Sequence, residues 1–327
     1  MLDVAAHEET TMAGQAGWRA KDLLDTDVMS RDEIDLVMET ADAMTEVRSR
    51  PVGKVATLRG ATVVTLFYEQ STRTRASFEV AAKAMGADVV NLTASGSSVE
   101  KGESLIDTVR TLEAIGADVL VMRHGSSGAP YLAARHTRAS VINGGDGTHA
   151  HPTQALLDLY TMRRHLGGLD GKRVVIVGDV LHSRVARSNL WTLLSQGAIV
   201  TLCGPATLLP RTLAGGGERG RVEVTTNFDD AVKGADVVMT LRMQKERQEA
   251  GLIPSLREYI AGYQLNARRL ASAAPGALVM HPGPMNEGIE IAPEIAHGVG
   301  SVIEEQVANG VAVRMAVLYL LMAARHG

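Results

Sequence analysis

The sequence predicts an α/β protein with two doubly wound parallel-sheet domains. First, short all-apolar runs alternate with helix-like amphipathic runs along nearly the whole chain, a pattern typical of parallel sheets buried on both faces. Second, this alternation is broken once, near 144–151, and 327 residues are too many for one compact core. We therefore expect two successive α/β units.

The first unit begins with a helix whose start is marked by a capping box. Ser30 is followed three residues later by Glu33, and the helix is expected to continue to about Arg48. Strands are then expected at 61–67, 87–92, 117–122 and 140–143, separated by helices at 73–85, 103–115 and 129–135. A further helix at 152–166 has Pro152 in its first turn, where the missing N–H costs nothing.

The second unit repeats the alternation. Its expected strands are 172–178, 198–204, 221–226, 235–241 and 276–281. Its expected helices are 184–195, a short one near 229–233 and a long amphipathic one at 302–324. The glycine-rich stretch 214–220 is expected to be a surface loop between strands.

Charge and composition argue against nucleic acid and membrane partners. The formal net charge is −4 and no basic run is present. No apolar run approaches the length of a membrane span, since 311–324 is short and interrupted by Arg314. The single cysteine, Cys203, allows no intrachain disulfide, which fits a reducing cytoplasm. The N-terminus lacks the features of a signal peptide, and residues 1–17 are expected to be poorly ordered.

Polar and basic residues follow most of the expected strands. In open α/β sheets, ligands bind beyond the carboxyl ends of the strands, so these positions are candidates for a binding site. The segments there are STRT (71–74), RH (123–124), GGDGTHAHPTQ (144–154), GDVLHSR (178–184), LRMQKER (241–247) and HPGP (281–284). Most of them carry arginine or histidine, which indicates a site for small anions.

The segment formed by Ser71, Thr72, Arg73 and Thr74 is a candidate phosphate site. A helix that begins here presents free N–H groups and its dipole to an anion, and the hydroxyls and guanidinium add charge-assisted hydrogen bonds. The alternative is a plain helix cap with surface arginines; the preceding core strand and the second arginine, Arg75, favour phosphate. The patterns G-x-G-x-x-G and G-x-x-x-x-G-K-[ST] are absent, so neither a nicotinamide cofactor nor a P-loop is expected.

Other basic residues suggest a second anion. Arg123 directly follows a strand, where a ligand anion would be a good partner for its guanidinium. Lys101 lies in the small-residue loop 96–104, for which a plain turn with a solvated lysine is the alternative. Arg184 and Arg242 are each most simply surface arginines in salt bridges, but together with Lys101 they could form a site for a dicarboxylate.

Two histidines, His149 and His151, raise the question of a metal site. We expect no metal, because no cysteine or acidic ligand cluster accompanies them. Neutral His151 could instead donate to a carbonyl oxygen, and Gln154 could contact the same group. No nucleophile paired with a base stands out. The sequence therefore predicts no cofactor, and catalysis by orienting two anionic small molecules with electrostatic stabilisation.

These motifs resemble those of aspartate carbamoyltransferase catalytic chains. STRTRASFE, SSVEKGES, MRH, GDGTHAHPTQALLDLY, VGDVLHSRVARS, LRMQKER and HPGP occur in the family's order, from about Trp18 to the C-terminus. STRTR and HPTQ are typical of carbamoyltransferases generally, whereas KGE, R-x-Q-x-E-R and H-P-x-P favour the aspartate branch. The ornithine branch has H-C-L-P, with cysteine where this chain has Pro282.

The resemblance implies that 1–151 bind carbamoyl phosphate, that 152–302 bind L-aspartate and that the last helix, 303–327, returns to the first domain. The residues implied to hold the phosphate are Ser71, Thr72, Arg73 and Thr74. Those implied to contact the carbamoyl group are Arg123, His151, Gln154 and the backbone of Gly283 and Pro284. Those implied to hold the aspartate carboxylates are Lys101, Arg184, Arg242 and Gln244.

The resemblance also implies a homotrimer with shared active sites, because Ser97 and Lys101 belong to a loop that reaches into a neighbouring subunit's site in the family. The aspartate α-amine would attack the carbamoyl carbon, an oxyanion would form near Arg73, Arg123 and His151, and phosphate would leave with the proton. The implied product is N-carbamoyl-L-aspartate, in pyrimidine (UMP) biosynthesis in the cytoplasm.

Two other functions stay open, ornithine carbamoyltransferase and a non-catalytic paralogue that acts as a scaffold. Assembly beyond a trimer, with regulatory chains or a dihydroorotase, is open too. Two positions depart from many relatives: Glu287 replaces a basic residue near the implied aspartate site, and Glu100 stands where some relatives carry a second lysine. Neither change removes a residue with an implied direct role.

Overall fold

The computed structural model describes residues 17–93, 103–217, 220–243, 252–253 and 255–326. Its helices are α1 (Arg31–Ser49), α2 (Thr72–Ala84), α3 (Leu105–Ala114), α4 (Ala129–Ala134), α5 (Pro152–Leu166), α6 (Arg184–Ser195), α7 (Phe228–Ala231), α8 (Leu256–Tyr263), α9 (Ala267–Leu270), α10 (Pro293–Ala296) and α11 (Ile303–His326). Its strands are β1 (Thr62–Phe67), β2 (Asp88–Thr93), β3 (Val119–His124), β4 (Ser140–Asp146), β5 (Arg173–Val177), β6 (Ile199–Cys203), β7 (Gly215–Gly217), β8 (Gly220–Thr225), β9 (Val237–Thr240) and β10 (Leu278–Met280). The predicted capping box is present, with the Glu33 N–H donating to Ser30 Oγ and the Ser30 N–H donating to Glu33 Oε2.

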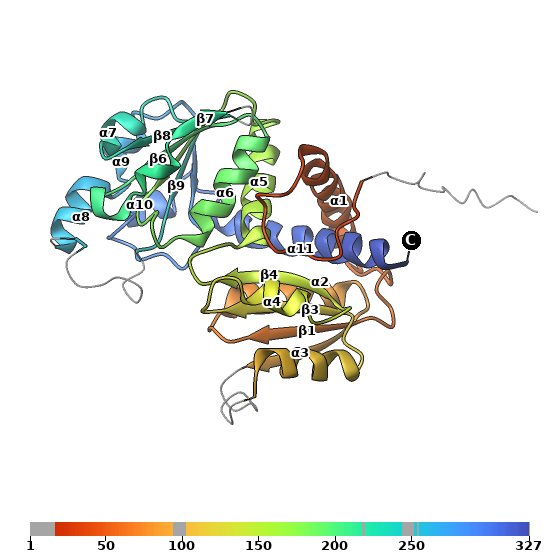
Figure 1. Cartoon of the computed structure of the whole chain (residues 1–327). Helices are drawn as coiled ribbons and strands as arrows, with labels where there is room; N and C mark the ends of the chain where they lie inside the picture. Colours follow the sequence, from red (N-terminus) through yellow and green to blue (C-terminus); the bar gives the residue numbers. More distant parts are fainter. Residues whose placement is uncertain (1–16, 94–102, 218–219, 244–251, 254, 327) are drawn as a thin grey trace, which may run out of the picture.

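The first sheet is parallel throughout, with strand order β2-β1-β3-β4. Alternate residues of its strands pack against opposite layers of helices. Val64 and Leu66 of β1 belong to a core with α3 and α4, whereas Val63 and Phe67 belong to a core with α1, α2 and α11. The sheet is therefore covered on both faces, as Figure 1 shows. This double burial explains why its strands are all-apolar runs.

The second sheet has the order β10-β9-β5-β6-β8-β7 and is parallel except for its last strand. One face packs on α6, and the other packs on the helices and loops between β8 and α11. The two doubly wound parallel sheets predicted from the sequence are confirmed. The prediction of a loop at 214–220 was wrong for Gly215–Gly217, which pair antiparallel with β8, because backbone pairing requires no side-chain pattern.

The last helix, α11, runs back from the second sheet and packs against α1, α2 and α5, which confirms the predicted return (Figure 1). The prediction of an amphipathic helix was wrong for most of its length. Nearly every residue from Gly310 to Met322 is buried, because neighbouring helices cover several sides. By length and composition Ile303–Arg325 could cross a membrane, contrary to the sequence expectation, yet 72% of its most apolar window is buried inside the fold.

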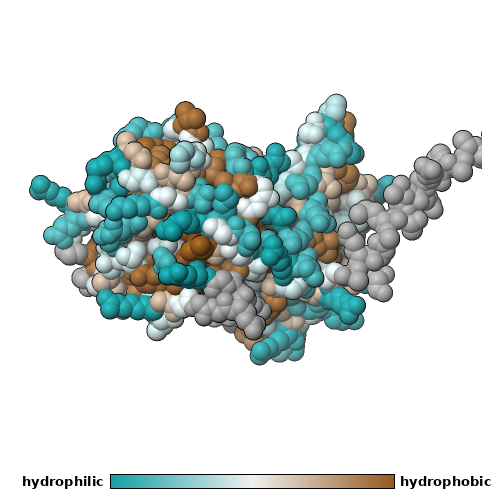
Figure 2. All heavy atoms as spheres, turned by 90° about the horizontal axis from the view of Figure 1, so that it is seen from above, coloured by the Kyte–Doolittle hydropathy of each residue, from teal (hydrophilic) through white to brown (hydrophobic). Residues whose placement is uncertain are grey.

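The helix α5 joins the two halves of the molecule. Every residue from Pro152 to Met162 is buried, and the helix packs against α1, α6 and α11. Apolar side chains of both sheets belong to one continuous core around α5 and α11. On the outer face seen in Figure 2, by contrast, hydrophobic residues lie in separate small groups among hydrophilic ones. The predicted boundary after His151 falls at the first residue of α5 and stays a prediction.

Candidate active site

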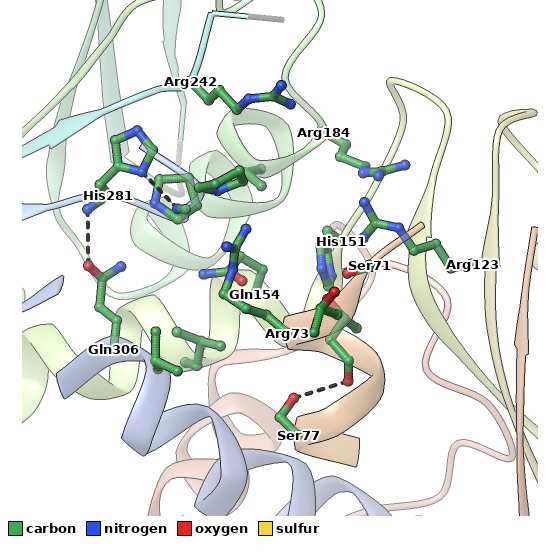
Figure 3. A pocket seen from close by; sticks show the side chains of 18 of the residues that line it. Ser71, Arg73, Ser77, Arg123, His151, Gln154, Arg184, Arg242, His281 and Gln306 are labelled. Atoms are coloured by element: carbon green, nitrogen blue, oxygen red, sulfur yellow. Dashed lines mark hydrogen bonds between the residues drawn. The ribbon is translucent and has the colours of Figure 1, made fainter. Parts of the chain in front are cut away.

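A cavity of about 560 Å³ lies among the loops that follow strands of both sheets. Segments after β1 and β4 and the end of β3 line it from the first sheet, and segments after β5, β9 and β10 line it from the second. α11 adds Gln306, Val307 and Arg314. Figure 3 shows labelled side chains from both sheets, among them Arg73, Arg123 and Arg242, around the cavity. This is the placement expected for a ligand site of open α/β sheets.

The start of α2 forms one wall of the cavity. Ser71 is the N-cap residue, and its side chain makes no capping hydrogen bond. Arg73 lies in the first helical turn, beside free N–H groups that favour an anion. Partial burial, and then the nearby Arg242, lower the pKa of Arg73, so a bound anion would relieve an unfavourable charge. Thr74 is buried and its carbonyl accepts from Ser77 Oγ (3.1 Å).

Two arginines of the site share one carboxylate. Glu69 Oε2 lies 2.8 Å from Arg184 Nη2 and 3.5 Å from Arg123 Nε. Each arginine also donates to a backbone carbonyl at 3.1 Å, Arg123 to Gly144 near the end of β4 and Arg184 to Gly147 in the β4–α5 loop. Because Glu69 follows β1 and Arg184 begins α6, this ion pair ties the two halves of the molecule together at the cavity.

The buried ring of His151 is held neutral. Its pKa lies well below the usual value, first because of burial and then because Arg123, Arg184 and Arg314 lie nearby. The backbone N–H of His151 donates to Ser188 Oγ at 2.9 Å, which fixes the residue at the start of α5. The ring Nδ1 is buried and has no hydrogen-bond partner in the part of the chain that the structure describes. A neutral ring with an unpartnered nitrogen suits a ligand that supplies a polar atom.

A buried polar network holds Gln154 at the cavity wall. Asp158 accepts hydrogen bonds from Gln154 Nε2 (2.9 Å) and Gln306 Nε2 (2.8 Å) at Oδ1, and from Asn189 Nδ2 (2.8 Å) at Oδ2. Burial raises the pKa of Asp158 to about 6, although these hydrogen bonds and the charge of Arg314 oppose the rise. The network therefore fixes the side-chain amide of Gln154 relative to α6 and α11.

The loop after β10 closes another side of the cavity. The Gly283 N–H donates to His281 Nδ1 at 2.7 Å, so the proton of this neutral ring lies on Nε2, 3.2 Å from Glu290. Gly283 has φ +66°, and a Cβ there would lie 3.1 Å from the guanidinium carbon of Arg73. The positive φ and the close approach of Arg73 both favour glycine at this position. Pro284 follows at the cavity wall.

The site residues predicted from the sequence that lie in the described part of the chain line one cavity. Those that line the cavity are Ser71, Thr72, Arg73, Thr74, Arg123, His151, Gln154, Arg184, Arg242, Gly283 and Pro284. Ser97, Glu100, Lys101 and Gln244 lie outside the described residues. Glu287 is not among the lining residues and pairs with His297 at 3.3 Å.

Sequence reasoning missed two charged residues of the site, Glu69 and Arg314. Glu69 lies two residues before the predicted phosphate motif, just after a core strand. This position could have identified it as a site residue from the sequence. Arg314 is buried in α11 with its guanidinium 5.1 Å from the Phe78 ring centroid. A lone arginine in an apolar helix was its signal. With these two, five arginines and one glutamate line the cavity among the residues that the structure describes, an excess of four positive charges in a chain whose net charge is −4.

Comparison with known domain families covers most of the chain. Residues 21–164 match "Aspartate/ornithine carbamoyltransferase, carbamoyl-P binding domain", and residues 170–321 match "Aspartate/ornithine carbamoyltransferase, Asp/Orn binding domain". The chain belongs to the aspartate/ornithine carbamoyltransferase family. It is 62% identical over 309 residues to the aspartate carbamoyltransferase catalytic subunit of Roseiflexus castenholzii, covering 94% of this chain and 97% of that relative. The resemblance inferred from the sequence motifs is confirmed.

Solved carbamoyltransferases of both branches have this fold. Aspartate transcarbamoylase from Trypanosoma cruzi, in complex with carbamoyl phosphate and aspartate, is 30% identical with a TM-score of 0.82, covering 92% of this chain and 97% of that chain. Ornithine carbamoyltransferase from Pyrococcus furiosus is 29% identical with a TM-score of 0.83, and the coverage is the same. The fold therefore serves both branches of the carbamoyltransferase family, and the choice of amine depends on side chains.

The environment of His151 predicts that its ring stays neutral from about pH 8 down to about pH 6, whereas an unperturbed histidine titrates within this range. The ring nitrogen resonances of the ¹⁵N-labelled protein, assigned with a His151→Gln variant, measure this directly. A protonated ring at pH 6.5 would contradict the assignment of His151 as a neutral donor.

Proposed function

We propose that this chain transfers the carbamoyl group of carbamoyl phosphate to the α-amine of L-aspartate, giving N-carbamoyl-L-aspartate and phosphate in pyrimidine (UMP) biosynthesis. The observation that carries this proposal is the excess of four positive charges around one cavity at the carboxyl ends of both sheets. Two anionic substrates suit such a cavity. The name of the Roseiflexus relative and the ligands of the Trypanosoma cruzi complex support the same reaction.

In the proposed complex, carbamoyl phosphate binds against the first domain, 1–151 with the returning helix 303–327, and aspartate binds against 152–302. The phosphate would lie at the start of α2, held by Ser71, Thr72, Arg73 and Thr74. The carbamoyl group would contact Arg123, His151, Gln154 and the backbone of Gly283 and Pro284, with Ser97 supplied by a neighbouring subunit. The aspartate carboxylates would be held by Lys101, Arg184, Arg242 and Gln244.

The chemistry requires positioning and charge stabilisation. The amine nitrogen attacks the carbamoyl carbon, a C–N bond forms, and the C–O bond to the phosphate then breaks. Arg73, Arg123 and the N–H of neutral His151 stabilise the negative charge that develops on the carbamoyl oxygen. The proton lost by the amine goes to the departing phosphate, so no side-chain base is needed.

We further propose a homotrimer with shared active sites in the cytoplasm, with Ser97 and Lys101 supplied by a neighbouring subunit. The single cysteine, Cys203, allows no intrachain disulfide and is buried, which is compatible with a reducing compartment. Regulatory chains or a dihydroorotase would dock outside this trimer.

Ornithine carbamoyltransferase is the second candidate function, because the fold serves both amines. The charge of the cavity favours aspartate, since the side-chain ammonium of ornithine would enter a site with an excess of arginines. Incubation with carbamoyl phosphate and each amino acid in turn separates the two activities. A scaffold without activity is less well supported, because the chain retains all the residues implied to act in the reaction.

Replacing Arg73 with alanine should lower kcat by ~10²–10³, because a charge-assisted donor is lost from the developing oxyanion. Lys83→Ala is the matched control, since Lys83 lies exposed in the last turn of α2. Steady-state kinetics and thermal unfolding of both variants check the prediction. Near-normal turnover of Arg73→Ala, or unfolding of that variant alone, would contradict the role in catalysis.

Replacing Arg242 with alanine should raise the KM for aspartate about 10- to 100-fold and change the KM for carbamoyl phosphate far less, because one charge-assisted carboxylate contact is lost. Kinetics with each substrate varied in turn check this. Arg257→Ala, at an exposed position of α8 outside the cavity, is the control. An equal loss for both substrates would mean that Arg242 has a structural role.

Shared active sites predict complementation between inactive chains. Lys101→Ala and Arg73→Ala should each be nearly inactive alone, and mixed trimers should regain part of the activity, since some sites combine both intact residues. Native mass spectrometry of tagged chains verifies that subunits exchanged. Confirmed hybrid trimers without recovered turnover would refute shared sites.

A further inference from the structure

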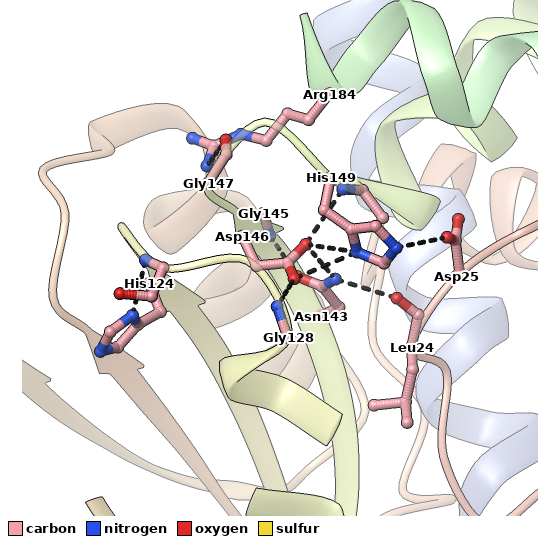
Figure 4. A network of polar contacts seen from close by, with 12 residues as sticks. Leu24, Asp25, His124, Gly128, Asn143, Gly145, Asp146, Gly147, His149 and Arg184 are labelled. Atoms are coloured by element: carbon pink, nitrogen blue, oxygen red, sulfur yellow. Dashed lines mark hydrogen bonds and ion pairs between the residues drawn. The ribbon is translucent and has the colours of Figure 1, made fainter. Parts of the chain in front are cut away.

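A histidine outside the proposed reaction lies between two buried carboxylates beside the cavity (Figure 4). His149 Nε2 lies 3.3 Å from Asp25 Oδ2, and its Nδ1 lies 3.2 Å from Asp146 Oδ2. Asp25 is 5% exposed and Asp146 is fully buried, whereas the His149 side chain is 38% exposed. Solvent protons can therefore reach the ring but hardly the carboxylates. We call these three residues the Asp25–His149–Asp146 clamp.

Asp146 is the end of the clamp whose carboxyl group is held in place by several hydrogen bonds. Its Oδ2 accepts from the Gly128 N–H at 2.7 Å, and its Oδ1 accepts from the Ala150 N–H at 3.0 Å and from Asn143 Nδ2 at 2.8 Å. Three N–H donors therefore fix the orientation of this carboxyl group. His149 Nδ1 therefore faces an acceptor, which places a proton on this nitrogen.

The segment around Asp25 is held by hydrogen bonds to β4 and α6, which are distant in the sequence. Leu23 pairs with the edge of β4, because its N–H donates to the Val141 carbonyl and its own carbonyl accepts from Asn143. Thr26 Oγ1 donates to the carbonyl of Ser188 in α6 at 2.9 Å. Segment 23–26 is thus anchored on both sides of Asp25, so His149 is bridged to a rigid support.

The loop that carries His149 also supports the catalytic side chains. Gly147, in the same loop, accepts from Arg184, and Gly144, at the end of β4 that leads into the loop, accepts from Arg123. His151 follows His149 by two residues. A shift of this loop would therefore displace three groups of the cavity at once, and misplacement by about 1 Å can cost ~10² in rate.

We propose that His149, by bridging Asp25 and Asp146, is a positioning residue that holds the β4–α5 loop in its catalytic shape. The side chains that it positions are those of Arg123, His151 and Arg184. The activity readout of this inference rests on the proposed carbamoyl transfer.

The clamp requires a proton between Asp25 and His149. A carboxylate oxygen only accepts, so this contact holds a proton either on Nε2 or on Asp25. Burial, with weaker contributions from Asp27 and Asp146, raises the pKa of Asp25 to about 6. When the pH rises and Asp25 loses this proton, the lone pair of His149 Nε2 faces the negative carboxylate of Asp25. The contact between the two residues then weakens. The other titratable groups that face the clamp are Asp27, Tyr131 and His124.

Three variants of the full chain test the clamp. His149→Ala removes the bridge. Asp25→Asn keeps the contact between residue 25 and His149 at all pH values tested, because the new side-chain amide donates to the unprotonated Nε2 of His149. His165→Ala is the matched control, since His165 pairs with one carboxylate, Glu305 at 2.7 Å, near the opposite end of α5.

We expect His149→Ala to lower kcat/KM for carbamoyl phosphate about 10- to 100-fold and His165→Ala to leave it unchanged. The ratio of kcat/KM of Asp25→Asn to that of the wild type should rise with pH from about 5.5 to about 8.5, because only the wild type loses its shared proton. Amide hydrogen exchange of segment 144–151, the end of β4 and the β4–α5 loop, should be faster in His149→Ala than in the wild type.

A flat ratio across this pH range, or unchanged exchange in His149→Ala, would overturn the clamp. If His149→Ala does not fold, the Asp25→Asn ratio decides alone. A wild-type protein that carbamoylates no amine would overturn the proposed function instead, and the exchange measurement, which needs no turnover, would then decide whether His149 holds the loop.

Discussion

Mutual repulsion among five arginine side chains is the constraint on which the rest of this structure depends. Each guanidinium at the cavity must be held in place before an anion arrives, and each has a desolvation cost. Glu69 offsets part of the repulsion by pairing with Arg123 and Arg184, and loop carbonyls accept from the same two side chains. Arg314 lies over the Phe78 ring. Among the described residues that line the cavity, arginines outnumber the one glutamate by four, and this positive charge is the basis of the proposed binding of phosphate and carboxylate groups.

The same positive charge sets the protonation of its neighbours. His151 is neutral because burial and three nearby arginines disfavour a further cation. Asp158, by contrast, keeps a pKa of only about 6 despite complete burial, since three amide donors and Arg314 stabilise its charge. These effects need a rigid frame, because electrostatic stabilisation works when charges do not reorganise. The shared apolar core of α5 and α11 supplies that frame across both sheets.

Much of the candidate site could be predicted because parallel strands deliver their carboxyl ends to one edge. The alternation of apolar runs in the sequence was enough to find the positions after the strands at 61–67, 117–122 and 235–241. The structure places the arginines at these positions around one cavity. The errors have equally physical causes. Gly215–Gly217 pair through backbone atoms, which leave no side-chain pattern. The last helix carries apolar residues on all sides because it is enclosed by α1, α2 and α5.

The sequence by itself determined the two α/β units, the resemblance to carbamoyltransferases and the prediction that residues 71–74 belong to a binding site. These depend on local periodicity and on short motifs, which neighbouring residues encode. Only the tertiary structure decided that Glu69 joins Arg184 across 115 positions, and that His149 lies between Asp25 and Asp146. Such contacts connect elements at no fixed spacing. These contacts depend on how the two sheets and the helices between them pack. The local pattern of residue types along the sequence does not specify that packing.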